Sequence, residues 1–211
     1  MQNPQVVEIS DPKLPRIFKE IVVFRGGIAI IPTDTCYGLA ANAFSETAIK
    51  RVFDIKKRQY SNPISVALSP VQLPFYADLD MFIPGITAID IPVPVTLVLK
   101  PLKPFPTFVT RQGKVGFRLG GHDELNELLT RTRSIVTATS ANVTKSPETY
   151  SLEEIEEQIQ LDAVDLVIDG GTLDRTSRVS AVIDLTEYPP IVHRDGAVVL
   201  KLQKIIKPVL K

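Results

Sequence analysis

Residues 26–58 read GGIAIIPTDTCYGLAANAFSETAIKRVFDIKKR. A short apolar strand is predicted from Ile28 to Ile31, and it runs into a polar loop that begins at Pro32. Ser45 is a suitable N-cap for a helix that we predict to extend to Arg58. A strand, a loop and a helix in this order are typical of α/β folds.

The helix predicted over residues 45–58 carries a lysine on its apolar side. Its apolar positions are Ala48, Ile49, Val52, Phe53 and Ile55. Lys56 follows Val52 by four residues and Phe53 by three, so it falls on the same side. An inward-pointing ammonium needs an anionic partner, because burying an unpaired charge costs several kcal/mol or removes the charge. Lys56 and Arg58 therefore indicate an anion site near the end of this helix.

The rest of the chain alternates between helical and strand patterns. Further helices are predicted over 15–24, over 123–131 and from Ser151, where Glu154 completes a capping box. Further strands are predicted at 64–68, 95–99, 115–119, 135–139, 166–168, 181–185 and 191–194. The region 74–94 suggests short helices and turns. The last strands follow one another too closely for helical crossovers, so we expect a single α/β domain with a mixed sheet.

Composition excludes several classes of protein. The chain has 211 residues, of which 44% are hydrophobic, and its 24 basic residues balance 24 acidic ones. Any anion site must therefore depend on local charge rather than on net charge. One cysteine, Cys36, and two histidines, His122 and His193, leave too few ligands for a disulfide framework or a structural zinc site. We see no signal peptide and no membrane-spanning run, and expect a cytoplasmic protein.

Three polar loops directly follow apolar strands. They begin at Pro32, at Thr137 and at His193. Strand ends that meet at one edge of an α/β sheet form the usual ligand crevice, and hydroxyls, amides and arginines suit a phosphorylated or carboxylated ligand. In any one loop these side chains serve equally well to satisfy the turn. Three such loops together with Lys56 and Arg58 favour a site.

Other chemistries fit the sequence less well. Neither G-x-x-x-x-G-K-[ST] nor G-x-G-x-x-G occurs. Ser140 and His193 could suggest a hydrolase, but Ser140 lacks the flanking glycines of a nucleophile elbow. Gly113-Lys114-Val115-Gly116 resembles an RNA-binding G-x-x-G loop, yet it leads into a strand pattern, which favours a plain turn. Cys36 is more simply a small buried hydrophobe than a nucleophile.

Seven motifs, taken in order, resemble the YrdC/Sua5/TsaC family of threonylcarbamoyl-AMP synthases. They are Pro32-Thr33-Asp34-Thr35-Cys36-Tyr37-Gly38-Leu39, Lys56-x-Arg58 with Asn62-Pro63, Pro94-Val95-Thr96-Leu97-Val98-Leu99, Val115-Gly116-Phe117-Arg118, Thr139-Ser140-Ala141-Asn142, Ser180-Ala181-Val182-Ile183-Asp184-Leu185 and Val192-His193-Arg194-Asp195-Gly196. Each motif alone is weak evidence, whereas the ordered set is specific. The resemblance covers residues 15 to 200, with residues 1–14 as an N-terminal extension and 201–211 as a tail that leaves no room for the second domain of longer members.

The resemblance implies a YrdC-like α/β fold, in which helices flank a twisted mixed parallel and antiparallel sheet with a concave basic cleft. It also implies that L-threonine, bicarbonate and ATP are combined into threonylcarbamoyl-AMP and pyrophosphate. A TsaD-type transferase would then modify adenosine 37 of tRNAs that read ANN codons. Mg²⁺ would accompany ATP, with no metal site formed by the protein itself. Such a reaction depends mainly on positioning and on charge neutralisation.

The resemblance also assigns roles to residues. Its catalytic set is Lys56, Arg58, Ser140 and Asn142. Its ATP-binding set is Arg58, Asn62, Thr96, Ser140 and Arg194. Its threonine-binding set is Thr33, Thr35, Arg118, Ala138 and Ser180, in which Arg118 takes the carboxylate of threonine.

The chain departs from the family pattern at Val93, Thr144, Lys145 and Ala181. Val93 replaces a glycine and could narrow the approach to the nucleotide, and Lys145 adds a cation beside the phosphates. Two alternatives stay open. One is a YciO-type paralogue with little synthase activity, although its S-x-N motif is typically degraded and here is whole. The other is a module that binds double-stranded RNA or tRNA, against which the zero net charge argues.

Overall fold

One mixed sheet organises the molecule, which we describe from a computed structural model over residues 3–79, 87–176, 179–196 and 201. The strands run in the spatial order β1-β9-β2-β3-β8-β4-β7-β5-β10-β11, and β6 pairs with β7. Their bounds are β1 Gln5–Glu8, β2 Ala29–Ile31, β3 Gly38–Ala40, β4 Ser65–Ala67, β5 Val95–Leu99, β6 Thr110–Arg111, β7 Lys114–Leu119, β8 Val136–Ser140, β9 Leu166–Asp169, β10 Ala181–Asp184 and β11 Ile191–Arg194. The pairs β1-β9, β2-β9, β4-β7 and β5-β10 are parallel and the others are antiparallel. The predicted mixed sheet is confirmed.

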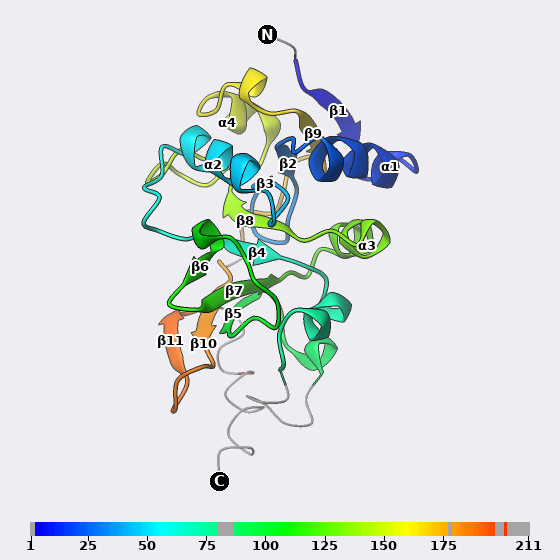
Figure 1. Cartoon of the computed structure of the whole chain (residues 1–211). Coiled ribbons are helices and arrows are strands. Elements are labelled where there is room, and N and C mark those ends of the chain that lie inside the picture. The colour runs from blue at the N-terminus through cyan, green and yellow to red at the C-terminus, as the bar shows by residue number, and fades with distance from the viewer. Residues whose placement is uncertain (1–2, 80–86, 177–178, 197–200, 202–211) are drawn as a thin grey trace.

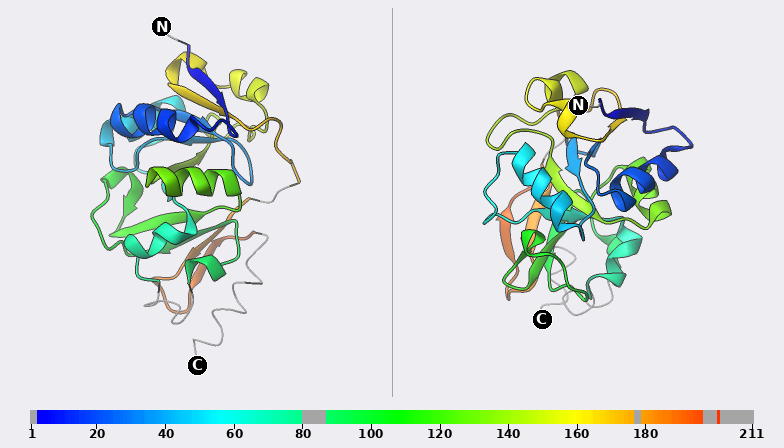
Figure 2. Two further views of the ribbon diagram at one scale, coloured as in Figure 1. Left: turned by 90° about the vertical axis from the view of Figure 1, so that its right-hand side faces the viewer. Right: turned by 45° about the horizontal axis from the view of Figure 1, so that its top comes forward.

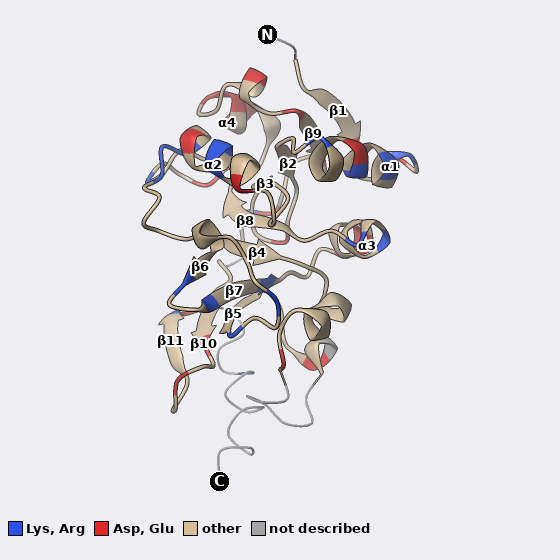
Figure 3. Ribbon diagram, in the orientation of Figure 1, with Lys and Arg blue, Asp and Glu red and all other residues tan. Residues whose placement is uncertain are grey.

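Helices cover both faces of this sheet. Their bounds are α1 Leu14–Phe18, η1 Lys19–Phe24, α2 Glu46–Ile55, η2 Pro70–Phe75, η3 Ala88–Asp90, η4 Thr107–Val109, α3 Asp123–Thr132, α4 Leu152–Glu156 and η5 Leu161–Ala163. In Figures 1 and 2, α1 and α3 lie together on one side of the sheet, and α2 and α4 lie on the other. None of the helices in the described ranges is long and apolar enough to cross a membrane. Figure 3 shows residues of both charge signs on α2 and on the helical segment formed by α1 and η1.

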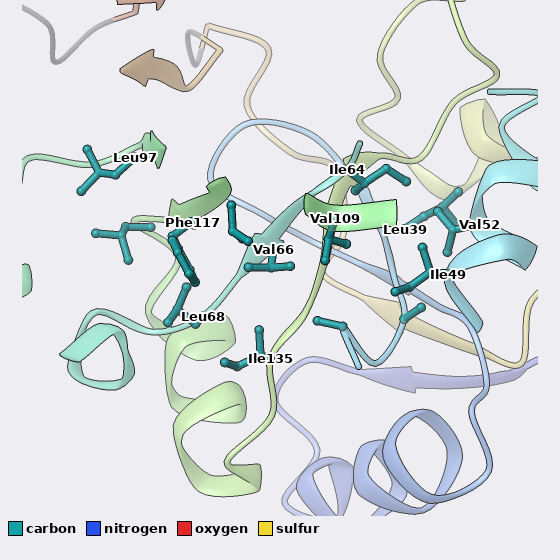
Figure 4. Close-up of a cluster of buried hydrophobic side chains, with 14 of the residues drawn as sticks. Leu39, Ile49, Val52, Ile64, Val66, Leu68, Leu97, Val109, Phe117 and Ile135 are labelled. Carbon is teal, nitrogen blue, oxygen red and sulfur yellow. The ribbon is translucent and has the colours of Figure 1, made fainter. Parts of the chain in front are cut away.

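β2 and residues 166–168 of β9 are apolar at every position, because both faces of the sheet are buried there. Leu166 and Ile168 of β9 pack in the cluster that holds the leucines of α3, whereas Val167 between them packs in the cluster on the α2 side. That second cluster, which Figure 4 shows in part, is the larger one and includes Ile49 and Phe117.

A carboxylate fixes the start of β9 relative to β2. The Oδ2 atom of Asp165 accepts hydrogen bonds from the backbone N–H of Ile28 at 2.7 Å and from Nη2 of Arg51 at 2.9 Å. Arg51 belongs to α2, so one side chain ties this helix to two neighbouring strands.

Most predicted elements are confirmed, and three strands were missed. The strand predicted at 95–99 has the same bounds as β5, and Ser45 and Ser151 accept N-cap hydrogen bonds from Ala48 and Glu154. The missed strands are β1, within the polar N-terminal segment, β3, directly after the loop that begins at Pro32, and the two-residue β6. The region 74–94 does contain 3₁₀ turns, although 80–86 lie outside the described residues, as do 197–200 and all of the tail but Lys201.

The helix predicted over residues 45–58 ends three residues early, at Ile55. Lys57 has a left-handed φ of 50°. The N–H of Arg58 bonds to the carbonyl of Phe53, and that of Lys57 bonds to the carbonyl of Asp54. This is a Schellman motif, which reverses the chain direction at a helix end. Lys56 and Arg58 therefore leave the helix towards different places.

Candidate functional site

A cleft lies on the α3 side of the sheet. Cross-strand neighbours share a face, and the row Ala67, Arg118, Thr96 and Val182 runs across β4, β7, β5 and β10. All four residues line the cleft, and Leu125 and Leu129 of α3 also contribute to its lining. One end of this sheet face is thus covered by α3, and the other end is open and forms the cleft.

Nine of the predicted site residues line this cleft. They are Thr33, Thr35, Arg58, Thr96, Arg118, Ala138, Ser140, Ser180 and Arg194. The remaining three, Lys56, Asn62 and Asn142, are not among the lining residues. Most of the residues predicted from the sequence therefore lie together around one cleft.

The loop after β2 carries hydroxyls to one end of the cleft. Thr33 Oγ1 donates to the carbonyl of Cys36 at 2.7 Å and lies 3.1 Å from Thr35 Oγ1. Arg118 Nη2 donates to Thr35 Oγ1 at 3.1 Å. The fully buried Tyr37 holds the loop in place, because its hydroxyl donates to the carbonyl of Gly171 at 2.8 Å. We call this the hydroxyl end of the cleft.

Asp34 belongs to the hydroxyl end and was not predicted as a site residue. One carboxylate oxygen of Asp34 accepts from Arg118 Nη2 at 2.5 Å, and the other accepts from the backbone N–H of Gly121 at 2.5 Å. The two side chains are only 12% and 13% exposed, for Arg118 and Asp34 respectively. Asp34 lies in the loop that begins at Pro32. No local sequence pattern shows that it forms an ion pair with an arginine 84 residues away.

Two further arginines line the same cleft, and we call the part that they form the arginine end. Arg58 donates through Nε to the carbonyl of Asn62 at 2.9 Å and through Nη2 to that of Pro63 at 3.1 Å. Arg194 donates through Nε to the carbonyl of Ser180 and through Nη2 to its hydroxyl, both at 2.7 Å. Burial lowers the pKa of Arg58. Desolvation, and then the nearby charge of Arg118, lower the pKa of Arg194.

Lys56 points inward as predicted, and its ammonium donates to neutral oxygens of the protein, so the expected contact with an anionic ligand stays a prediction. The residue is 2% exposed, and its Nζ donates to the carbonyls of Ser140 at 2.5 Å and Asn142 at 2.7 Å and to Asn142 Oδ1 at 2.9 Å. Neutral oxygens therefore surround the ammonium. Burial, and then the charge of Arg58, lower the pKa of Lys56 to about 8.

Asn142 links Lys56 to the cleft. Its Oδ1 also accepts from Ser140 Oγ at 2.6 Å, while its Nδ2 donates to the carbonyl of Ser146 at 2.6 Å. Lys56 and Asn142 thus bind the end of β8 from outside the cleft lining and position the Ser140 hydroxyl. Asn62 differs again: the residue is exposed, and its backbone carbonyl accepts from Arg58.

The positions that depart from the family pattern lie around the cleft rather than in its lining. Val93 is partly buried against the core, and Lys145 is exposed. Thr144 donates from Oγ1 to the carbonyl of Lys56 at 2.8 Å. Val93 is not among the lining residues, and its effect on the approach of the nucleotide stays a prediction.

The less favoured chemistries find no support in the geometry. Ser140 and His193 line two different cavities. Burial, and then the charge of Glu148, raise the pKa of Cys36 to about 11, so the thiol is protonated at neutral pH. Gln112 and Gly113 both have positive φ and join β6 to β7, which confirms the plain turn. Glu148, which was not predicted, lines the cleft as a second acidic side chain besides Asp34.

A family model covers most of this architecture. The Sua5/YciO/YrdC model, whose description is "Telomere recombination", matches residues 22–196. The chain belongs to the Sua5/YciO/YrdC family. Every residue of the cleft lining lies within the matched range of this family model.

Relatives of this Sua5/YciO/YrdC chain are known from archaea. Threonylcarbamoyl-AMP synthase of Pyrococcus abyssi is 32% identical over 193 residues, which cover 86% of this chain and 54% of the relative. A Methanocaldococcus jannaschii relative is 29% identical over 208 residues and 96% of both chains. The crystal structure of P. abyssi Sua5 complexed with L-threonine superposes with a TM-score of 0.79 at 29% identity, covering 97% of this chain and 61% of that one. The chain thus spans little more than half of the P. abyssi protein.

Proposed function

We propose that the protein is an L-threonylcarbamoyl-AMP synthase, which forms threonylcarbamoyl-AMP and pyrophosphate from L-threonine, bicarbonate and ATP. The observation that carries the proposal is that one cleft is lined both by Thr33, Thr35 and Arg118 of the hydroxyl end and by Arg58, Ser140 and Arg194. The P. abyssi relatives named for this activity and crystallised with L-threonine support it.

The chemistry places an amino acid beside a triphosphate. The threonine amine attacks the carbon of bicarbonate, which loses water to leave a carbamate. A carbamate oxygen then attacks the α-phosphorus, and pyrophosphate leaves. Both reactants are negatively charged where they meet, so the main tasks of the protein are to neutralise charge and to hold the reacting groups in line.

The arginine end suits the triphosphate. The guanidiniums of Arg58 and Arg194 are already oriented by carbonyl oxygens, and planar guanidiniums bind phosphate oxygens in pairs. Ser140 and Thr96 would add hydroxyls to the nucleotide. We assign Lys56 and Asn142 a supporting role, since they position Ser140 from behind rather than line the cleft.

The hydroxyl end suits threonine, with Arg118 on its carboxylate and Thr33, Thr35 and Ala138 around it. Ser180 would contact threonine from the arginine end, where its hydroxyl accepts from Arg194 Nη2. Mg²⁺ would enter on the substrate MgATP. Phosphates and water would hold this ion, as is common for Mg²⁺. A TsaD-type transferase in the cytoplasm would consume the product to modify tRNA.

The test is pyrophosphate release from purified protein with MgATP, bicarbonate and L-threonine. Release must require both threonine and bicarbonate; release that continues without either one contradicts a synthase. Ser140→Ala should lower the rate about 10- to 100-fold because a positioned hydroxyl is lost. The matched control Ser10→Ala alters an exposed serine and should leave the rate unchanged. A folded wild-type protein that binds both substrates without turnover would be a low-activity paralogue instead.

A further inference from the structure

The hydroxyl end of the cleft contains an ion pair, not a lone cation. Arg118 and Asp34 meet at 2.5 Å, and both side chains are nearly enclosed. The orientation of the carboxylate is fixed by its second bond, from the N–H of Gly121. Gly120 adds to this enclosure, because a Cβ at that position would lie 3.2 Å from Asp34 Oδ1. The pair is therefore a rigid dipole with no net charge.

The arginine end has a different electrostatic character. Arg58 and Arg194 donate to the carbonyl and hydroxyl oxygens of Asn62, Pro63 and Ser180, which are neutral. Glu148 also lines the cleft, but no ion pair among the described residues joins it to either guanidinium, and it accepts from the Tyr150 hydroxyl at 3.2 Å. Two guanidiniums without a paired carboxylate suit a polyanion.

A compensated pair would be a poor site for a simple anion. The negative charge of Asp34 cancels most of the attraction that Arg118 alone would exert on one. A ligand that carries both charges, by contrast, gains from both members of the pair. An α-amino acid is such a ligand, because its carboxylate and its ammonium are attached to the same carbon atom.

We infer that Asp34 and Arg118 together recognise the zwitterion of the amino acid, with Arg118 on the α-carboxylate and Asp34 on the α-ammonium. The inference rests on the proposed function and adds to it one residue, Asp34, as the partner of the threonine amine. The ligand is a free α-amino acid with an unblocked amine. Amine-free hydroxy acids and N-acylated amino acids satisfy Arg118 but leave Asp34 without its charge partner, so they bind poorly.

Calorimetry without ATP and bicarbonate tests the contact directly. The two ligands are L-threonine and (2S,3R)-2,3-dihydroxybutanoate, in which a hydroxyl replaces the ammonium. Asp34→Asn should weaken L-threonine binding about 30-fold and change the affinity for the amine-free analogue less than about threefold, because only threonine loses a charge-assisted contact. Asp162→Asn, at an exposed position of η5, is the matched control and should change neither affinity.

Each other outcome overturns the inference. An equal loss for both ligands would mean that Asp34 only positions Arg118, and no loss for either would mean that it has no part in binding. Should Asp34→Asn fail to fold, the wild type alone decides, since it must bind L-threonine at least about 10-fold more tightly than the analogue. Threonine binding that ignores Asp34 counts against this inference alone, whereas no threonine binding at all also counts against the proposed function.

Discussion

At one end of the cleft Arg118 shares its charge with Asp34, whereas at the other Arg58 and Arg194 donate to neutral oxygens. Arginine side chains thus have two different roles in this cleft, and the hydrogen-bond partners of each arginine determine which role it has. A paired guanidinium is a positioned donor without net charge, and an unpaired one attracts anions. The difference teaches that the arginines of this cleft cannot be counted as one basic surface.

The largest expected effect comes from removing Arg118. Arg118→Ala leaves the nearly enclosed Asp34 without its cation, so we expect the free energy of unfolding to fall by about 3 kcal/mol. Threonine affinity should fall by at least about 100-fold. Urea unfolding and calorimetry measure the two losses, and Arg131→Ala, at an exposed arginine of α3, serves as the control.

The double variant Arg118→Ala with Asp34→Asn sharpens this prediction. It should recover most of the lost stability, because no buried charge remains unpaired, but it should not recover threonine binding. Stability that stays low in the double variant would contradict the account of the pair as a compensated dipole.

An intermediate effect is expected at the arginine end. Arg58→Gln keeps hydrogen-bond donors but removes the charge, so the KM for ATP should rise about 10- to 100-fold while the affinity for threonine stays unchanged. In the wild type, high salt should weaken ATP binding and leave threonine binding nearly constant, because screening acts on net charge. Equal salt dependence for both ligands would remove the proposed difference between the two ends.

The smallest expected effect concerns Lys56, whose pKa is lowered to about 8 from its ordinary 10.5. Between these values the unfolded chain holds a proton that the folded chain has released, so the stability of the wild type should rise with pH. The gain relative to Lys56→Met should be roughly 1 kcal/mol from about pH 8 to about pH 9. Urea unfolding of both proteins across this range measures it. Parallel pH profiles would contradict the lowered pKa.

The wild type is compared with Lys56→Met because Cys36 also has a shifted pKa that affects stability. Its raised pKa of about 11 has the opposite effect on stability in alkaline solution, because the folded state retains the proton longer than the unfolded one. Cys36 is present in both proteins, so the comparison removes the part of its contribution that does not depend on the charge of Lys56.

Local patterns in the sequence predicted what local physics decides. Ser45 caps α2, and the apolar run 95–99 forms β5, because caps and strand patterns depend on neighbouring residues. The inward direction of Lys56 also followed from its spacing. Its neutral partners did not, since they come from a turn more than 80 residues away. Asp34 was missed for the same reason, because its meeting with Arg118 is a property of the sheet order.

Asp165 helps to determine the register of β9 in the sheet. A strand that is apolar on both faces can slip by one residue with little loss of buried apolar area, so hydrophobicity does not specify its alignment. A carboxylate has only one place where both the Ile28 N–H and the Arg51 guanidinium can reach it. The bonds of Asp165 therefore favour one register of β9 against β2 over the registers shifted by one residue.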